Sequence, residues 1–185
     1  MVEAALGLFH ERGVNGTSVD AVLERSGTGK SQFSHYFKNK DGLVLAVLEY
    51  FYAQMEAGAY SAVPAIRTWQ DLEFWLRSFI VWQKKTGFTL SCPIGTIGHD
   101  LDTKQDDIRA VASRIFKWRR DFVAQFFKQE QAAGRLSKTA SPRELADFCY
   151  TIIQGGLWMG KIERSPRLFE SSLKHTLIYL KSLRI

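Results

Sequence analysis

The side chains with the clearest capacity for chemistry lie in a short run between positions 30 and 40. Ser31, Gln32 and His35 can donate and accept hydrogen bonds, and a glutamine amide can bond adenine at two positions. The groups suited to phosphates are Lys30, Lys38, Lys40 and Tyr36. This mixture of hydrogen-bonding and cationic groups is typical of a surface that binds nucleic acid.

Helical spacing would place these side chains on one face. At about 100° per residue, Phe33 and Phe37 fall together and point inward. The opposite side then carries Ser31, Gln32 and His35, with Ser34 and Lys30 along one flank. Because any short amphipathic helix has a polar face, the pattern alone is also compatible with an ordinary surface helix.

The residues before this run predict the element that would position it. Thr17, with Asp20 three residues later, fits a capping box, so we expect a helix to begin there. Apolar residues follow at helical spacing, and Gly27 supplies the left-handed conformation of a sharp turn. A helix, a tight turn and a second helix form the unit that lays a recognition helix in the major groove. The turn and the flanking lysines therefore favour the DNA-binding interpretation.

Residues 4–51 resemble the DNA-binding domain of TetR-type transcriptional regulators. The matching positions are Ala4, Ala5, Leu8, Phe9, Gly13, Thr17, Val22, Gly27, Lys30, His35, Tyr36, Phe37, Lys40 and Leu43. The resemblance implies that phosphates are held by Thr17, Lys30, Tyr36 and Lys40, and that bases are faced by Ser31, Gln32 and His35. Thr28 and Ser34 complete the DNA-binding residues that we expect.

Two positions depart from the family pattern. Gly29 stands where a serine or threonine usually caps the recognition helix, and Ser34 replaces a usual aromatic residue. Members of the family usually also carry a short basic arm before the first helix. Because this sequence begins inside an apolar-periodic helix, we expect that arm to be missing or truncated.

The remaining pattern is helical, and the predicted fold is all-α. We expect helices over residues 2–12, 43–59, 69–85, 106–133, 142–164 and 166–183, with the clearest break at Ser61-Ala62-Val63-Pro64. Pro93, Gly95 and Gly98 weaken a helix prediction for residues 90–101.

The predicted organisation is a three-helix DNA-binding domain over residues 1–42 and a larger helical domain over residues 43–185. Residues 43–59 would form the linking helix. The Cys-Pro-Ile-Gly stretch at residues 92–95 and the Gln-Gly-Gly element at residues 154–156 resemble one branch of TetR-type regulators. The resemblance implies that the larger domain binds an effector and dimerises.

Charge is unevenly distributed in an otherwise ordinary composition. The 185 residues are 45% apolar and 24% charged, with a net charge of +6. Residues 1–50 hold five basic and six acidic side chains, a net charge of −1, whereas residues 51–185 hold 20 and 13, a net charge of +7. The relevant electrostatic feature is therefore the local cluster around residues 30–40, not the global excess.

Aromatic residues are dense in the second predicted domain. A packed core explains any single one of them, but interiors rich in rings often leave a cleft for an apolar ligand. The resemblance implies such a cavity, walled by the middle helices. The residues expected to line it are Trp75, Phe79, Trp82, Phe116, Phe122, Phe126, Gln154 and Trp158.

Gly156 and Gly160 lie about one turn apart in an otherwise apolar helix. Glycine costs a helix about 1 kcal/mol, so its placement there indicates close packing. The last predicted helix offers a matching stripe of Leu173, Leu177 and Leu180. We interpret the two stripes as a homodimer interface; a close contact within one chain is the alternative.

Signals for catalysis are weak. His99 and Asp100 lack a nucleophile or a metal-spaced partner, and residues 95–98 lack the lysine of a phosphate-binding loop. Cys92 beside Pro93 is either a redox sensor or an inert thiol. We expect no catalytic residue, metal or cofactor. Two cysteines without a disulfide framework, and no signal peptide or apolar run of about 18 residues, favour a cytoplasmic protein without membrane contact.

These patterns predict a homodimeric transcriptional regulator of a palindromic double-stranded DNA operator. The preferred mechanism is a repressor, released when a small apolar or aromatic effector stabilises a conformation with the wrong separation of recognition helices. One alternative is an all-α small-molecule-binding protein or enzyme that uses the aromatic cavity without binding DNA. The other is an activator or a ligand-independent architectural protein.

Overall fold

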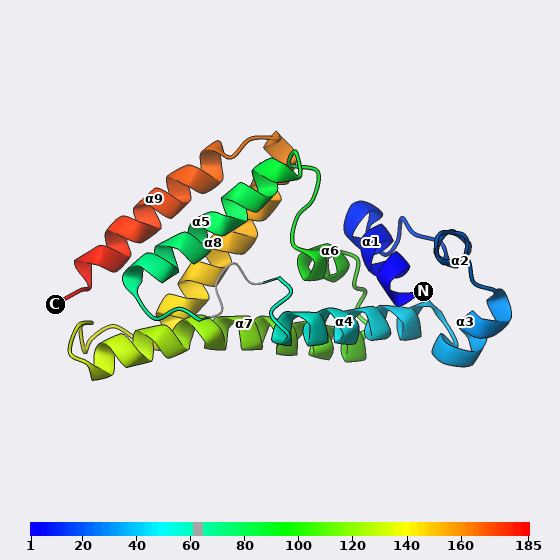
Figure 1. Ribbon diagram of the computed structural model, residues 1–185, viewed down its shortest axis with the longest axis horizontal. Helices are drawn as coiled ribbons and strands as arrows, with labels where there is room; N and C mark the ends of the chain where they lie inside the picture. Colours follow the sequence, from blue (N-terminus) through cyan, green and yellow to red (C-terminus); the bar gives the residue numbers. More distant parts are fainter. Residues whose placement is uncertain (61–64) are drawn as a thin grey trace. The chain divides into compact units, whose positions relative to one another are not determined.

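The regular elements of the structure are helices. The computed structural model describes residues 1–60 and 65–185, so the break predicted at residues 61–64 lies outside the described residues. The described helices are α1 (Val2–Arg12), α2 (Val19–Ser26), α3 (Lys30–Phe37), α4 (Lys40–Glu56), α5 (Trp69–Lys85), α6 (Pro93–His99), α7 (Asp106–Ala132), α8 (Pro142–Glu163) and α9 (Arg167–Ser182). The predicted all-α fold is confirmed (Figure 1).

Two helices differ from the sequence-based expectation. α4 begins at Lys40 rather than at residue 43, because the Asn39 side chain accepts a hydrogen bond from the backbone N–H of Gly42 at 2.9 Å and so caps the helix earlier. The ambiguous segment contains α6, with Pro93 at its first turn, where a missing N–H costs nothing. Buried Ile94 and Ile97 hold this short helix in place.

The described chain divides into two compact units. Unit 1 comprises Met1–Tyr60 and Ser91–Ile115, and unit 2 comprises residues 65–90 and 116–185. α7 therefore contributes its first turns to unit 1 and the remainder to unit 2. The predicted boundary after residue 42 separates a DNA-binding part from an effector-binding part. It concerns function and not compactness, so it stays a prediction.

Unit 1 is organised around the contacts of α1. This helix packs against α2, α4 and α6, and α3 packs against α4. The apolar side chains at these contacts are at most 2% exposed, and they include Leu8, Phe9, Leu43, Val47 and Leu48. Burying side chains of this size from several helices fixes the small N-terminal helices that carry the polar run.

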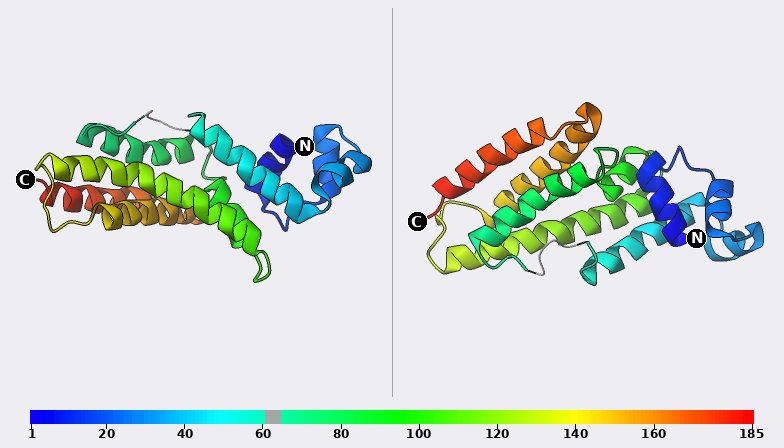
Figure 2. Two further views of the ribbon diagram at one scale, coloured as in Figure 1. Left: turned by 90° about the horizontal axis from the view of Figure 1, so that it is seen from below. Right: turned by 45° about the horizontal axis from the view of Figure 1, so that its top comes forward.

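Unit 2 is a bundle in which α8 contacts both α5 and α9 (Figure 2). Its core includes Trp75, Leu76, Phe127, Ile153 and Phe169, each at most 2% exposed. Side-chain caps begin two of the helices. Thr68 and Asp71 form a reciprocal capping box at the start of α5, and Ser141 caps α8.

Candidate functional site

α2, which precedes the turn into α3, is capped at both of its ends. Ser18 Oγ accepts a hydrogen bond from the N–H of Ala21 at 3.1 Å, so the capping residue is Ser18 and not Thr17 as predicted. Gly27, with φ of 64°, ends α2 in the left-handed conformation, and its N–H bonds the last carbonyls of the helix. A residue with a side chain would be strained there, so Gly27 fixes where α3 begins.

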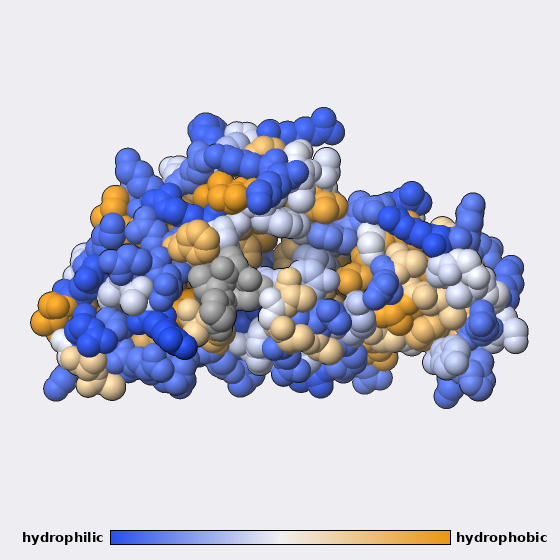
Figure 3. Space-filling view, in the orientation of Figure 1, coloured by the Kyte–Doolittle hydropathy of each residue, from blue (hydrophilic) through white to orange (hydrophobic). Residues whose placement is uncertain are grey.

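α3 buries its aromatic side and exposes its polar side. Phe33 is 8% exposed, and its ring centre lies 5.8 Å from that of Phe37. The exposed side chains of this helix are Lys30, Ser31, Gln32, Ser34, His35 and Tyr36. The structure thus brings six of the predicted DNA-binding residues together, and the surface over α3 is mainly hydrophilic (Figure 3).

The lysines lie at the two ends of this helix. Lys30 Nζ is 3.2 Å from Asp20 Oδ1, but both side chains are more than 70% exposed, so the pair is weak and exchangeable. Lys40 is the first residue of α4, whose capped N-terminus follows α3 directly. A lysine beside a helix N-terminus suits a phosphate, since the free N–H groups and the helix dipole also favour an anion.

The two predicted threonines have other partners. Thr17 is 1% exposed, and its hydroxyl donates to the carbonyls of Gly13 at 2.8 Å and Leu8 at 3.3 Å. The expectation that Thr17 holds a phosphate is therefore not supported by its geometry, because its hydroxyl points into unit 1. Thr28 is half-buried, and its hydroxyl lies 2.6 Å from that of Ser26.

Gln32 is exposed, and its side chain also accepts a hydrogen bond from the backbone of its own helix terminus. Gly29 caps α3 without a side chain, and the backbone N–H of Gly29 donates to Gln32 Oε1 at 3.1 Å. This is one half of a capping box, since a glutamine at the third helical position reaches back to the capping residue. This bond directs Gln32 Oε1 toward Gly29 in the free protein.

Both halves of the chain match known families. Residues 1–47 match the family model of bacterial regulatory proteins, tetR family, and residues 69–176 match the Tetracyclin repressor-like C-terminal domain. The second match alone spans more than half of the chain. The chain belongs to the TetR family. The resemblance predicted from residues 4–51 is confirmed: the chain is a DNA-binding transcriptional regulator and not an enzyme.

Relatives support the assignment along most of the length. Transcriptional regulator AcuR of Cereibacter sphaeroides is 29% identical over 90% of this chain and 77% of its own. HTH-type transcriptional repressor DhaR of Mycobacterium sp. is 27% identical over 89% of this chain and 82% of its own. A cysteine mutant of the TetR family regulator CifR, complexed with 26-bp double-strand operator DNA, is 19% identical, with a TM-score of 0.77 over 95% of this chain and 93% of that one. The last similarity shows the fold alone.

The structure gathers part of the aromatic set predicted to bind an effector. Within unit 2, the ring centre of Trp75 lies 5.1 Å from that of Phe79 and 6.2 Å from that of Phe122. Arg119 places its guanidinium 6.0 Å from the ring centre of Trp75 and 5.8 Å from that of Phe79. Phe79 and Phe122 are half-buried. A cation over partly exposed rings is a combination that can hold a flat, electron-rich or anionic molecule.

Other predicted pocket residues lie elsewhere. Phe126 packs against Trp69 at 5.2 Å between ring centres, and Phe116 packs against Tyr150 at 5.8 Å. Trp158 is 46% exposed on α8, so its expected place in the pocket wall stays a prediction. Trp82 and Gln154 are half-buried. Sequence spacing placed these aromatics on the right helices but could not decide which neighbour each ring would meet.

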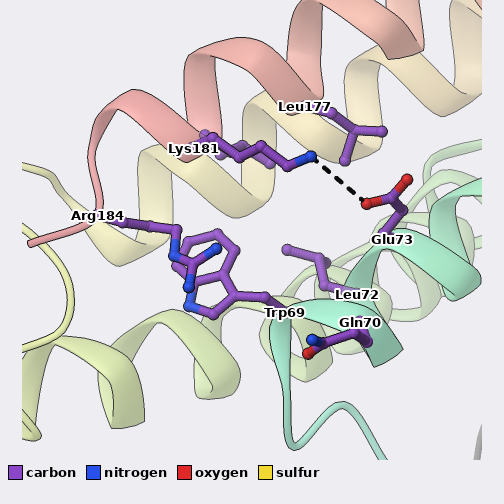
Figure 4. Close-up of a pocket in the computed structure, with 8 residues that line it drawn as sticks. Trp69, Gln70, Leu72, Glu73, Leu177, Lys181 and Arg184 are labelled. Atoms are coloured by element: carbon purple, nitrogen blue, oxygen red, sulfur yellow. Dashed lines mark ion pairs between the residues drawn. The ribbon is translucent and has the colours of Figure 1, made fainter.

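A cavity of about 180 Å³ lies at the N-terminus of α5 and the C-terminal end of α9. Its lining residues are Trp69, Gln70, Leu72, Glu73, Leu177, Leu180, Lys181 and Arg184. Figure 4 shows Arg184 over the Trp69 indole, with 5.0 Å between the guanidinium carbon and the ring centre, and Lys181 paired with Glu73. None of the predicted aromatic pocket residues lines this cavity, and it is smaller than the roughly 300–1,000 Å³ of typical ligand pockets.

Trp69 in this cavity is held by a buried carboxylate. Glu130 is 3% exposed and accepts hydrogen bonds from Trp69 Nε1 at 2.6 Å and from Arg135. The Arg135 hydrogen bond, followed by that from Trp69, keeps the pKa of Glu130 below its usual value despite the opposing effect of burial. These contacts give Trp69 a structural role at the start of α5.

The predicted dimer glycines serve contacts inside the chain. A Cβ added at Gly156 would lie 2.3 Å from the ring of Phe169 on α9, and one at Gly160 would lie 2.3 Å from Gln83 Oε1 on α5. The leucine stripe is also internal, with Leu173, Leu177 and Leu180 at most 7% exposed. The assignment of these five residues to an intermolecular surface is therefore corrected: they let α8, α9 and α5 approach one another in a single chain.

A different face of α8 and α9 carries exposed apolar side chains. On α8 they are Phe148, Trp158 and Ile162, and on α9 they are Ile178 and Tyr179, with exposures from 37% to 62%. We call these five residues the outer stripe. The rings of Phe148 and Tyr179 meet at 5.7 Å, so the stripe crosses from one helix to the other. The sequence carried a signal for it: α8 is apolar on more than one side, which indicates two contact faces.

The two cysteines are free thiols and are buried, one in each unit. Cys149 is buried, and burial raises the pKa of its thiol to about 12, so it stays protonated. Cys92 caps α6, with its Sγ 3.5 Å from the N–H of Gly95. Among the residues that the structure describes, no cluster of three or more His, Cys, Asp or Glu could hold a metal ion. No helix in the described ranges is long and apolar enough to cross a bilayer.

Proposed function

We propose that the chain is a homodimeric repressor that binds a palindromic operator through α3 and leaves it when a small apolar or aromatic effector binds unit 2. The observation that carries the proposal is the exposed polar side of α3, held outward by buried Phe33 and flanked by Lys30 and Lys40. The name of DhaR as a repressor supports the sign of regulation. The operator complex of CifR supports the mode of binding.

In this proposal, Lys30, Tyr36 and Lys40 bind phosphates, while Ser31, Gln32 and His35 face base edges in the major groove. Thr28 and Ser34 border this surface. Thr17 acts indirectly, since its buried hydroxyl fixes the loop before α2. Half to two-thirds of hydrogen bonds in such complexes go to phosphates and sugars, so the lysines set register while the polar side chains select sequence.

Two features of unit 2 support the dimer and the effector. The outer stripe on α8 and α9 offers five exposed apolar side chains, two of which, Phe148 and Tyr179, are in contact, and exposed apolar patches mark interaction sites. A twofold axis through it would relate two copies of α3, as a palindromic operator requires. The cluster of Trp75, Phe79, Phe122 and Arg119 supplies rings and a cation that suit an aromatic effector.

The DNA-binding part is tested by selecting bound sequences from random double-stranded DNA and measuring affinity against salt concentration. Lys40→Ala should weaken binding to all sequences alike. The slope of log affinity against log salt is negative. Because a dimer would carry two copies of Lys40, the magnitude of this slope should decrease by about 2. A change in base preference without a change in slope would contradict the phosphate role.

Lys128→Ala is the matched control, since it removes the same charge from an exposed position of α7 in unit 2. It should leave the slope within error of the wild type. Enrichment of no sequence by the wild-type protein would reject DNA binding and favour the small-molecule-binding alternative. A reporter gene behind the selected operator then separates a repressor from an activator.

A further inference from the structure

The first turn of α3 depends on a side chain that also faces outward. Gly29 occupies the capping position and has no side chain to accept a hydrogen bond from the helix. The reverse contact is present, because Gln32 Oε1 accepts from the Gly29 N–H at 3.1 Å. No other side chain among the described residues caps this end of α3. Gln32 therefore already caps the start of α3 in the DNA-free protein.

This bond divides the Gln32 amide into an occupied and an available half. A glutamine side chain has one carbonyl oxygen, which accepts, and one NH₂ group, which donates twice. The oxygen is directed at Gly29, and within the described chain Nε2 has no hydrogen-bond partner. Because Gln32 is exposed and its oxygen is turned toward Gly29, the group best placed to bond a ligand is the NH₂ donor.

We propose that Gln32 keeps this cap when it enters the major groove and selects guanine through Nε2. The inference rests on the proposed DNA-binding function. Guanine presents two neighbouring acceptors, O6 and N7, which two N–H donors can share, whereas adenine presents its N6 donor beside N7. The two-bond contact to adenine expected from sequence needs Oε1 and Nε2 to face the base together, whereas Oε1 is turned toward Gly29.

The competing geometry is one in which Gln32 releases Gly29 on binding DNA. If the Gln32 amide left Gly29 on binding, the Gly29 N–H would need a new acceptor, and a DNA phosphate is the group available at a helix N-terminus. The freed amide would then be able to donate and accept, and adenine would be its preferred base. Guanine and adenine are thus the outcomes that separate a retained cap from a released one.

The test compares bases selected from random double-stranded DNA by the wild-type full-length protein, Gln32→Glu and Gln32→Ala. Glutamate keeps an oxygen for Gly29 but replaces the donor with a second acceptor. The wild type should select guanine at one position of each half-site, Gln32→Ala should lose that preference, and Gln32→Glu should change it to cytosine, which presents a donor. Discrimination at that position should be about 5- to 150-fold in the wild type.

Only relative base preference is compared, because the added charge of Gln32→Glu lowers affinity for all DNA. A position where the wild type selects adenine and Gln32→Ala relaxes that choice would overturn the proposal. Relaxation at no position would do so as well. Failure of the wild type to enrich any sequence would reject DNA binding itself, which is a different result from enrichment with adenine.

Hydrogen exchange of the Gly29 amide in the DNA-free protein gives a second readout. Exchange should be faster in Gln32→Ala than in the wild type and should stay slow in Gln32→Glu. Ser31→Ala is the matched control, because Ser31 shares the exposed side of α3 and makes no bond to Gly29. Equal exchange in the wild type and Gln32→Ala would show that the cap is absent in solution and would overturn the proposal.

Discussion

At the scale of single residues, side chains with the same chemistry take opposite roles within a few positions. Thr17 and Ser18 both carry a hydroxyl before α2, yet Ser18 caps the helix while Thr17 points inward to the carbonyls of Leu8 and Gly13. Sequence placed a capping hydroxyl in this region correctly. It could not choose between two adjacent hydroxyls, because the choice depends on where α1 lies, and that is a tertiary contact.

A prediction at this scale concerns Phe122 and the effector. Phe122 is half-buried and lies 6.2 Å from Trp75 between ring centres, so replacing it by leucine changes the shape of the cluster with little added void. The cost in stability should stay well below the about 3–5 kcal/mol of a buried Phe→Ala change. Phe122→Leu should fold normally but respond to a different range of ligands. The measurement is release of labelled operator by small aromatic and apolar compounds of graded size.

The matched control is Phe127→Leu, which alters a fully buried ring of the same helix. It should lose stability without a change in the ligand profile. For any compound that releases wild-type protein, operator DNA must weaken binding of that compound by the same factor, typically about 5- to 150-fold. If Phe122→Leu responded to the same compounds as the wild type, Phe122 would belong to the core and not to the effector site.

At the scale of helices, the pattern predicted most elements but not all of their contacts. The periodic segments at residues 2–12 and 69–85 formed helices with those bounds, since apolar spacing runs up to Gly13 in one and to Thr86-Gly87 in the other. The sequence was ambiguous for α6, because glycine and proline lower local helix propensity. α6 is stabilised by its contact with α1 and by burial of Ile94 and Ile97, which offset its low helix propensity. That tertiary contact cannot be seen in the local sequence pattern.

Neighbouring glycines in α8 provide a prediction at this scale. The space beside Gly156 is filled by the Phe169 ring, whereas a Cβ added at Gly155 would meet nothing within 4 Å. Gly156→Ala should therefore lower the free energy of unfolding by about 1–3 kcal/mol through overpacking. Gly155→Ala should raise it by up to about 1 kcal/mol, because alanine favours the helix more than glycine does.

Urea unfolding at one protein concentration measures both changes. Sedimentation checks that each variant keeps the wild-type oligomeric state, so that the difference reports packing within the chain. Equal effects of the two substitutions would contradict the assignment of Gly156 to the contact between α8 and α9. The same result would reopen the interface role that its spacing first suggested.

At the scale of the whole molecule, the family and its DNA-binding element could be predicted from sequence, but the exposed apolar face of α8 and α9 could not. Residues 4–51 carry many local constraints of turn, cap and spacing, and these are visible without a structure. An apolar helix with two faces does not reveal which face is internal. The structure separates them: Gly156 and Gly160 face Phe169 and Gln83, while the outer stripe is exposed.

The last prediction tests the outer stripe as the dimer interface. Trp158 is 46% exposed on α8, so Trp158→Glu should leave the fold intact but place a charge in a buried apolar contact of the dimer. Sedimentation should then show a monomer at concentrations where the wild type is a dimer. Phe74→Glu is the matched control, since Phe74 is an aromatic residue of α5 that is 59% exposed and lies outside the stripe.

DNA binding should follow the assembly state. A monomer presents one recognition helix, so Trp158→Glu should bind a palindromic operator and a single half-site with similar weak affinity, whereas the wild type and Phe74→Glu should prefer the palindrome. The preference arises because the second half-site binds at the high effective concentration that the dimer imposes. A Trp158→Glu protein that stays dimeric and keeps this preference would move the interface to another face. Loss of dimerisation in Phe74→Glu as well would show that surface charge, and not the stripe, decides assembly.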